Sequence, residues 1–353
     1  MNDNKVQELQ TIIILMLGAK ANICDGFTFE DEYELAKKTW AANLPDHIKL
    51  IYFDGGNYMK NEFVEDKEKN CYKLHLACED DMRYTFKKTW MAYRFIADKY
   101  SPDWIFRTNT STYVNIRVLN DFIMKYADPE ITYGSDLYSL SEACCPYPLC
   151  IYPRGNGILT SKEVYDKAII KNGISFAYQT ICDDIVFGNL INTYNINKGR
   201  KYIDYIGGLP HAWYKCVDVE FNNGHKLSKF GASNLNYNNF VTITVKKYRE
   251  REKEKEHYLE LHEKIKSNQH YIDLQKKIKL DNMKNVEEPI WTNKMLKYVK
   301  DPSIFIGSVL GYINIDKWKS LDKNSLFLYE LGHKASDDEQ HYKYKEIQGY
   351  NFF

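Results

Sequence analysis

Short apolar runs alternate with amphipathic stretches along the first half of the chain. Residues 11–19 (TIIILMLGA), 48–54 (IKLIYFD) and 103–109 (DWIFRTN) are apolar enough to be buried strands, and residues 31–40 and 84–100 between them have helical spacing. The order strand, helix, strand, helix, strand is typical of strands joined by crossover helices in a largely parallel sheet. We therefore predict an α/β fold, with one sheet flanked by helices.

The second half continues this pattern and then changes character. Residues 130–138 predict a further strand, residues 154–169 a glycine-containing turn and a strand that enters a helix, and residues 182–194 the start of another helix. VTITV at 241–245 indicates a last core strand, and the very charged stretch at 246–265 predicts a mostly solvated helix. We place a first domain at residues 1–245, and a charged helix with a helical C-terminal extension of unknown role at residues 246–353.

Composition narrows the class of protein. Lys plus Arg equals Asp plus Glu at 48 each in 353 residues, so no global charge points to nucleic acid or to a membrane. The apolar run at 11–19 is too short to span a bilayer and lacks the flanks of a signal peptide. Eight cysteines in a chain of this length favour reduced thiols and a cytoplasmic protein, and the cluster at 144–150 has no second half with zinc-like spacing.

Small polar side chains end the strand at 103–109. Asn109, Thr110 and Ser111 follow directly, and ligands of open α/β sheets bind outside the carboxyl ends of the strands. A nucleotide or phosphate ligand is therefore expected there. The chain has neither the glycine-rich dinucleotide fingerprint nor a phosphate loop that ends in Gly-Lys-Ser, so these two kinds of site are excluded.

Five segments, in order along residues 10–245, resemble the β-1,3-galactosyltransferase and Fringe-like glycosyltransferases. DWIFRTNTSTYVN (103–115) is similar to the family's D-x-x-x-K-T-D-D-D-x-x-V-N motif, with Arg107 in place of its Lys. Upstream, ELAKKTW and DDMRYTFKKTW resemble the R-x-T-W and D-x-Y-x-N-L-x-x-K-T segments, and downstream YPRGNGILTS and DDIVFG resemble Y-P-x-x-x-x-G-x-G-Y-x-x-S and E-D-V-x-x-G. The matching positions are Thr39, Trp40, Lys88, Thr89, Asp103, Thr108, Val114, Asn115, Tyr152, Pro153, Gly155, Gly157, Ser161 and Asp184.

The resemblance implies a GT-A fold and an inverting transfer of sugar from a nucleotide-sugar. Such a transfer needs a general base for the acceptor hydroxyl and a group that stabilises the leaving diphosphate. Asp184 matches the family's base, and Asp183 stands where the family has Glu. The alternative is that both residues only cap a helix.

The resemblance fails at its metal motif. Where the family places carboxylates against a divalent cation, this chain has Asn109, Thr110 and Ser111, and neutral oxygens hold Mg²⁺ or Mn²⁺ weakly. Three accounts stay open: the diphosphate is held without metal by Arg107, Arg154 or Lys side chains, a metal is held elsewhere, or activity is lost. We favour the first, although Arg107 could instead only pair with a carboxylate.

Further positions complete the predicted site. Asp54 could meet the nucleotide base or ribose, or cap a turn, and His211 could line the site or be structural. The turn from Gly155 to Gly157 is expected to let backbone approach the donor or acceptor. If a metal is bound, its candidate ligands are Asp136, Asp183 and His211.

Together with the missing membrane anchor, the resemblance implies a cytoplasmic enzyme, bacterial or viral, that transfers sugar from a UDP-sugar to a glycan acceptor in surface glycan synthesis. This hypothesis requires no cofactor, and Mn²⁺ or Mg²⁺ would be held weakly. One alternative is a glycosyltransferase acting on the modified bases of phage DNA, against which the neutral net charge counts. The other is a catalytically silent glycan-binding or scaffold protein with the same fold.

Overall fold

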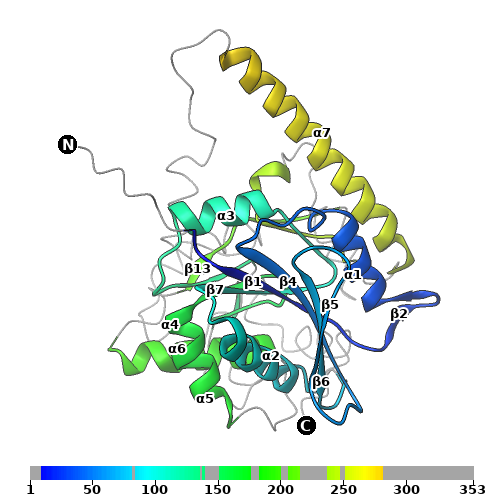
Figure 1. The fold of residues 1–353 in the computed structure, drawn as a ribbon. Helices are drawn as coiled ribbons and strands as arrows, with labels where there is room; N and C mark the ends of the chain where they lie inside the picture. Colours follow the sequence, from blue (N-terminus) through cyan, green and yellow to red (C-terminus); the bar gives the residue numbers. More distant parts are fainter. Residues whose placement is uncertain are drawn as a thin grey trace, which may run out of the picture.

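The computed structural model describes residues 9–81, 84–135, 137–139, 151–175, 183–199, 206–214, 237–246 and 251–280. Its centre is an eight-stranded sheet of order β13-β9-β12-β7-β1-β4-β6-β5 (Figure 1). The strands of this sheet are β1 (Ile12–Leu17), β4 (Ile48–Gly56), β5 (Glu62–Glu65), β6 (Cys71–Ala77), β7 (Trp104–Asn109), β9 (Thr132–Gly134), β12 (Ile158–Ser161) and β13 (Ile206–Gly208). The middle strands β7, β1, β4 and β6 are parallel, whereas β12 and β5 run antiparallel to their neighbours.

Helices cover both faces of the sheet (Figure 1). On one face lie α1 (Phe29–Lys38), α3 (Ile116–Lys125) and α7 (Glu254–Leu280), and on the other α2 (Thr85–Tyr100), α4 (Lys162–Val164), a π-helical turn (Tyr165–Ile170), α5 (Lys171–Gly173) and α6 (Asp183–Asn197). Side chains of β1 alternate between the two layers: Ile12, Ile14 and Met16 join one hydrophobic core and Ile13 and Leu15 the other. Burial on both faces explains why this strand is a continuous apolar run.

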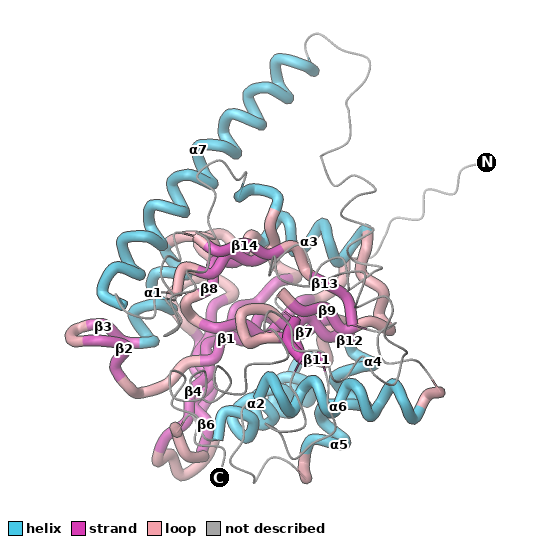
Figure 2. Tube along the Cα trace, turned by 180° about the vertical axis from the view of Figure 1, so that it is seen from behind, coloured by secondary structure: helices cyan, strands magenta, loops and turns pink. Residues whose placement is uncertain are grey.

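A small sheet lies beside the main one. It has the order β14-β15-β8, from His211–Trp213, Thr242–Thr244 and Thr112–Val114. Two further pairs are β2 (Asn22–Cys24) with β3 (Phe27–Thr28), and β10 (Leu137–Ser139) with β11 (Ile151–Pro153), and short 3-10 turns span Tyr237–Asn239 and Arg251–Lys253. Strand β8 of the small sheet begins three residues after β7 ends, and the labels of β8 and β14 mark this sheet beside the main one (Figure 2).

The first turns of α7 pack on this region. Tyr258, Leu261 and Ile265 are buried in the same core as β1, and the Trp40 indole N–H donates to the Tyr258 hydroxyl. The Tyr258 hydroxyl also lies 3.4 Å from the carbonyl oxygen of Thr112. The helix expected at 246–265 therefore exists and buries one face. The domain boundary after residue 245 stays a prediction.

The α/β fold class with a parallel-rich sheet flanked by helices is confirmed. Three strands of the main sheet were not predicted: β5 and β6 at one side of the sheet, and β13 at its other edge. For β5 and β6 the sequence shows why. Their polar residues alternate with apolar ones, as in Tyr72, Lys73, Leu74, His75 and Leu76 of β6, because only one face is fully buried. The predicted last core strand at 241–245 lies in the small sheet and not in the main one.

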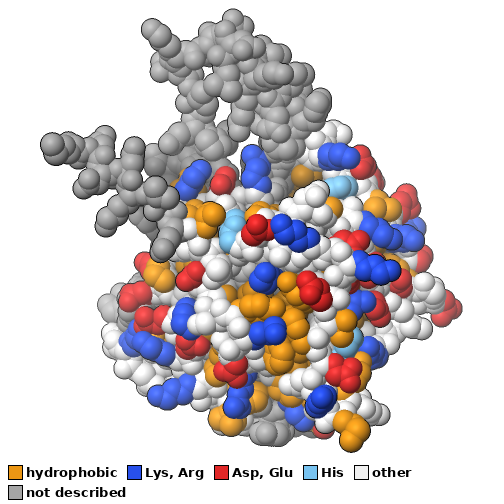
Figure 3. Space-filling model, viewed as in Figure 1, with side chains coloured by type: hydrophobic (Ala, Val, Ile, Leu, Met, Phe, Trp, Pro, Cys, Tyr) orange, Lys and Arg blue, Asp and Glu red, His pale blue; other side chains and the backbone are white. Residues whose placement is uncertain are grey.

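The surface of one face carries interspersed Lys, Arg, Asp and Glu side chains, with one group of apolar side chains near the lower centre of the view (Figure 3). Among the described helices, none combines the length and the apolar character that crossing a membrane requires.

Candidate functional site

The strand order places a topological switch point at the carboxyl ends of β1 and β7. From β1 the chain moves to β4 and β6 on one side and returns through β7 on the other, and ligands of open α/β sheets bind at such a switch point. Leu17 pairs with Asn109 of β7 and with Phe53 of β4, so Asn109 ends one strand that flanks β1 and Asp54 lies near the carboxyl end of the other. Strands are spaced by about 4.8 Å, which puts these two positions about 10 Å apart.

Arg107 of β7 is buried and engaged on several sides. Its Nη2 lies 2.6 Å from Asp183 Oδ2, and its Nη1 donates to Asn109 Oδ1 at 2.8 Å and to the carbonyl oxygen of Gly155. The side chain is 2% exposed. The sequence left open whether Arg107 meets a diphosphate or a carboxylate. The structure shows the carboxylate pair, and it comes from a helix and not from the sheet.

Asp183 and Asp184 begin α6 and have different surroundings. Asp183 is buried: its Oδ2 accepts from the Thr89 hydroxyl at 2.9 Å, and its Oδ1 from the backbone N–H of Asp184 at 3.0 Å. Asp184 is half-buried, and its carboxylate accepts locally from the backbone N–H of Ile185 at 3.0 Å. Asp183 is thus tied into the structure, whereas Asp184 faces partly outward.

The charges around Asp184 set its proton affinity. Burial of the carboxyl raises the pKa of Asp184 to about 6, and repulsion from Asp183 adds to the rise. The positive charges of Arg107 and half-buried Arg154 oppose it. A carboxylate with this pKa is largely ionised at pH 7 and is more basic than an ordinary Asp, which suits a general base.

The glycine turn is needed for close packing. A Cβ built on Gly155 would lie 2.1 Å from Arg107 Nη1, and one on Gly157 would lie 2.0 Å from the Ser135 hydroxyl. Neither residue has positive φ. The space beside these two glycines is therefore taken by Arg107 and Ser135. Contact of this turn with a ligand stays a prediction.

His211 lies inside a polar network on the small sheet. It is 7% exposed, with Nδ1 2.8 Å from Thr242 Oγ1 and Nε2 3.3 Å from the Asn156 amide nitrogen. With that amide donating to Nε2, the neutral imidazole carries its proton on Nδ1 and donates to Thr242. The backbone carbonyl oxygen of Asn156 accepts from the Thr108 hydroxyl of β7 at 3.2 Å. His211 is thus connected to Thr108 of β7 through a single residue, Asn156.

Asp54 belongs to a separate cluster at the end of β4. Its carboxylate is 1% exposed and lies 3.0 Å from Lys20 Nζ and 2.7 Å from His75 Nδ1. Tyr58 stacks on His75 with ring centroids 5.2 Å apart. Contact with a base or ribose would come from the half-exposed Lys20 and from Tyr58 more readily than from Asp54 itself.

Thr110 and Ser111 are more deeply buried than Asn109. Both are buried, and the Thr110 hydroxyl donates to Glu32 of α1, whose carboxylate is 1% exposed. The backbone carbonyl of Ser111 accepts from Val245 N at 3.1 Å. Of the three residues predicted to replace a metal motif, Asn109 is the half-buried one and the best placed for a ligand.

No group of three His, Cys, Asp or Glu side chains is arranged to hold a metal ion within the described ranges. Of the candidate ligands, Asp183 pairs with Arg107 and His211 with Thr242, and Asp136 lies outside the described residues. That Mn²⁺ or Mg²⁺ is held only weakly and is not required stays a prediction.

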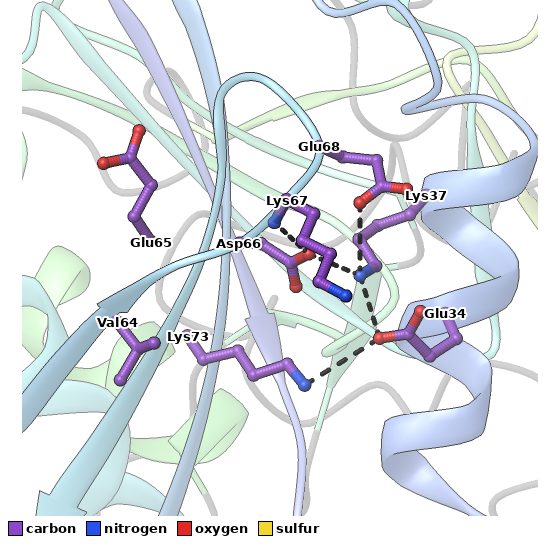
Figure 4. A pocket seen from close by; sticks show the side chains of 8 residues that line it. All are labelled: Glu34, Lys37, Val64, Glu65, Asp66, Lys67, Glu68 and Lys73. Atoms are coloured by element: carbon purple, nitrogen blue, oxygen red, sulfur yellow. Dashed lines mark hydrogen bonds and ion pairs between the residues drawn. The ribbon is translucent and has the colours of Figure 1, made fainter.

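A groove of about 380 Å³ lies elsewhere, between α1 and the β5–β6 hairpin (Figure 4). Its lining is charged, and Lys37 Nζ lies 2.9 Å from Glu34 and 2.8 Å from Asp66. The groove sits at the amino end of β6, whereas Asn109 and Asp54 sit at carboxyl ends of strands. It is therefore separate from the candidate site.

Sequence reasoning missed several residues that build the site. Thr89, Asn156 and Glu32 hold Asp183, Thr108 and Thr110 respectively. Lys88, next to Thr89, is buried and joins Asp80 at 2.7 Å to the carbonyl oxygen of Gly18 at 3.2 Å. The match of Lys88 and Thr89 to the family motif indicated these two positions. The motif did not show which residues they contact.

Of the comparisons with known proteins, only the one with solved structures gave matches. No family model and no curated protein matches the sequence. A glycosyltransferase involved in glycosylation of the major capsid of PBCV-1 is 12% identical with a TM-score of 0.37, over 70% of this chain and 98% of that one. Mouse xyloside xylosyltransferase 1 is 8% identical with a TM-score of 0.32, over 67% and 96% of the two chains.

The inositol-1-phosphate CTP transferase of T. maritima is 9% identical with a TM-score of 0.30, over 53% of this chain and 83% of that one. Glycosyltransferases and a nucleotidyltransferase thus both occur among the similar structures. At TM-scores below 0.5, these likenesses do not bear on which reaction this chain performs.

Proposed function

We propose that the chain is an inverting glycosyltransferase that moves a sugar from a nucleotide-sugar to a hydroxyl of a glycan acceptor. The observation that carries the proposal is the Asp184 carboxylate: half-buried, at the start of α6, beside Arg154 and the end of β7, with its pKa raised to about 6. The order of motifs along the chain supports the same reaction. Asp184 is the proposed base.

In the proposed reaction Asp184 accepts the proton of the acceptor hydroxyl. The freed oxygen attacks the anomeric carbon, the bond between that carbon and the diphosphate breaks, and the nucleoside diphosphate leaves with the bonding electrons. Arg154 supplies positive charge on that side. Asn109, whose side-chain oxygen accepts from Arg107, presents its amide N–H groups on its other side, where a diphosphate oxygen could accept them.

A diphosphate held by these groups would not require a metal. Asn109, Thr110 and Ser111 offer no carboxylate, so we propose that Mn²⁺ or Mg²⁺ contributes weakly, if at all. The donor is proposed to be a UDP-sugar, with its nucleoside toward Lys20, Tyr58 and Asp54. Transfer should then persist in EDTA.

The test begins with a thermal-shift screen of the protein against UDP-, GDP-, CMP- and dTDP-sugars, because a ligand of the folded state raises the melting temperature. The stabilising donor is then used in a hydrolysis and transfer assay with and without EDTA. Turnover in EDTA supports the proposal in full. If turnover vanishes in EDTA and returns with Mn²⁺, the chain is an enzyme but its site is not metal-free. Donor binding without any turnover indicates a glycan-binding protein.

A further inference from the structure

Arg107, Thr89 and Asp183 form one buried group that joins three elements. Asp183 Oδ2 is shared by Arg107 Nη2 of β7 at 2.6 Å and by the Thr89 hydroxyl of α2 at 2.9 Å. The backbone N–H of Asp183 also lies 3.2 Å from the Thr85 hydroxyl. The start of α6 is therefore fixed from two sides, and Asp184 is the next residue.

Arg107 has little capacity left for a ligand. Its Nη1 serves Asn109 and the Gly155 carbonyl, its Nη2 serves Asp183, and the side chain is 2% exposed. Its Nε is buried and has no hydrogen-bond partner among the described residues. Gly155 covers the guanidinium so closely that a Cβ would lie 2.1 Å from it. A diphosphate could reach this group only after the Arg107 contacts opened.

We infer that Arg107 and Thr89 are positioning residues, which fix the Asp183 carboxylate beside Asp184 and thereby control when and where Asp184 is charged. The inference rests on the proposed role of Asp184. It gives Arg107 an indirect part in catalysis in place of contact with the donor. The Lys-to-Arg change in the motif then has a reason: a planar guanidinium can bind Asp183, Asn109 and a backbone carbonyl at once, which an ammonium on a flexible stem does less well.

The charges near Asp184 determine the expected effects. Among the described residues, Asp183 of α6 repels its ionised form, and Arg107 of β7 and Arg154 of the turn before β12 favour it. Tyr93 of α2 interacts electrostatically with Arg107 and Asp183, and burial raises the pKa of its phenol, so it stays neutral. Removing Arg107 takes away one of the two positive charges that favour the ionised form of Asp184 and leaves the repulsion from Asp183, so ionisation of Asp184 becomes less favourable.

The test is a carboxyl ¹³C NMR titration of the full chain, with the two resonances assigned by their loss in Asp184→Asn and Asp183→Asn. In Arg107→Met, the upper of the two titration steps of the pair should rise by roughly one pH unit or more. Arg107→Lys, which keeps the charge, should lie between this variant and the wild type. Asp183→Asn should shift Asp184 downward. Arg94→Met, an exposed arginine of α2, is the control and should not move either step.

Steady-state kinetics separate this role from donor binding. Positioning predicts that Arg107→Met lowers kcat and shifts the acid limb of kcat/KM, with the KM for donor nearly unchanged. A raised donor KM with an unmoved titration overturns the inference. If Arg107→Met does not fold, Asp183→Asn decides, because an unmoved Asp184 step there also overturns it. Absence of turnover in the wild type would reject the proposed function, while the titration still decides on the positioning group.

Discussion

Asp184→Asn should abolish sugar transfer and at the same time stabilise the protein at neutral pH. An amide retains the shape of the carboxylate and its acceptor oxygen for the Ile185 N–H, but it cannot take a proton from an acceptor hydroxyl. General-base catalysis contributes about 10²- to 10⁴-fold, so kcat should fall by about that factor. Donor affinity should change little.

The stabilisation follows from the direction of the pKa change. The folded-state pKa of Asp184 is about 6, against 3.8 for the free group, so the folded state binds its proton more tightly than the unfolded state does. The contribution of Asp184 to the free energy of unfolding is therefore greatest below pH 4, and it is lost as the pH rises through 6. At about 1.4 kcal/mol for each pH unit between the two values, the loss at pH 7.5 is about 3 kcal/mol at most. Asn cannot ionise and does not suffer it.

The assay compares urea denaturation at pH 4.5 and pH 7.5, together with transfer of a labelled sugar. In the wild type, the free energy of unfolding should include a decrease between the two pH values that Asp184→Asn lacks. Asp121→Asn, a half-exposed carboxylate on α3, is the matched control and should change neither readout. Near-normal turnover in Asp184→Asn would remove this residue from the base role. A variant that loses both activity and stability would refute the electrostatic reasoning.

Three further changes test the scaffold of the site. Lys88→Met should destabilise the protein by about 3 to 5 kcal/mol in denaturant titrations, since it leaves Asp80 without its buried partner, whereas Lys87→Met removes an exposed pair and should cost less than about 1 kcal/mol. Equal losses in the two variants would contradict the reading of Lys88. Gly155→Ala should displace Arg107 and lower both the melting temperature and kcat, with overpacking worth about 1 to 3 kcal/mol; an unchanged protein would mean that the turn yields without cost. Tyr258→Phe should lower stability by about 1 kcal/mol, measured in the same way, because it removes the acceptor of the Trp40 indole N–H; no loss would show that this bond contributes nothing.

Much of the fold could be predicted because periodicity reports burial directly. The apolar runs became β1, β4 and β7, and the amphipathic stretches became α1 and α2. β5 and β6 were missed because β5 is the edge strand and β6 lies next to it, and both carry polar residues on a face that is not fully buried, so that their pattern resembles a loop. Strand order could not be derived from the pattern, since it depends on long-range pairing.

The matched motif residues show a second limit of sequence reasoning. Asp103 accepts from the backbone and hydroxyl of Thr11, and Asn115 caps α3, so these two support the fold and not the reaction. The partners of Arg107 and Asp183 also come from distant parts of the chain. A motif identifies which side chains matter at a position, but its spacing does not tell what each of them touches.

The packing of β15 and α7 around the segment after β7 has a consequence for synthesis. Thr112 and Val114 pair with Thr244 and Thr242, and Tyr113 meets His262 at 2.9 Å, so this segment acquires its neighbours from residues made roughly 150 positions later. At about 5 to 20 residues per second, a ribosome needs about 8 to 30 s to supply them. Throughout that interval, Tyr113 and Val114 of the nascent chain lack the part of their native cover that β15 and α7 supply. Chaperone demand during translation should accordingly be highest before α7 emerges, and a ribosome stalled between residues 115 and 240 should hold a chain that is unable to close this part of its core.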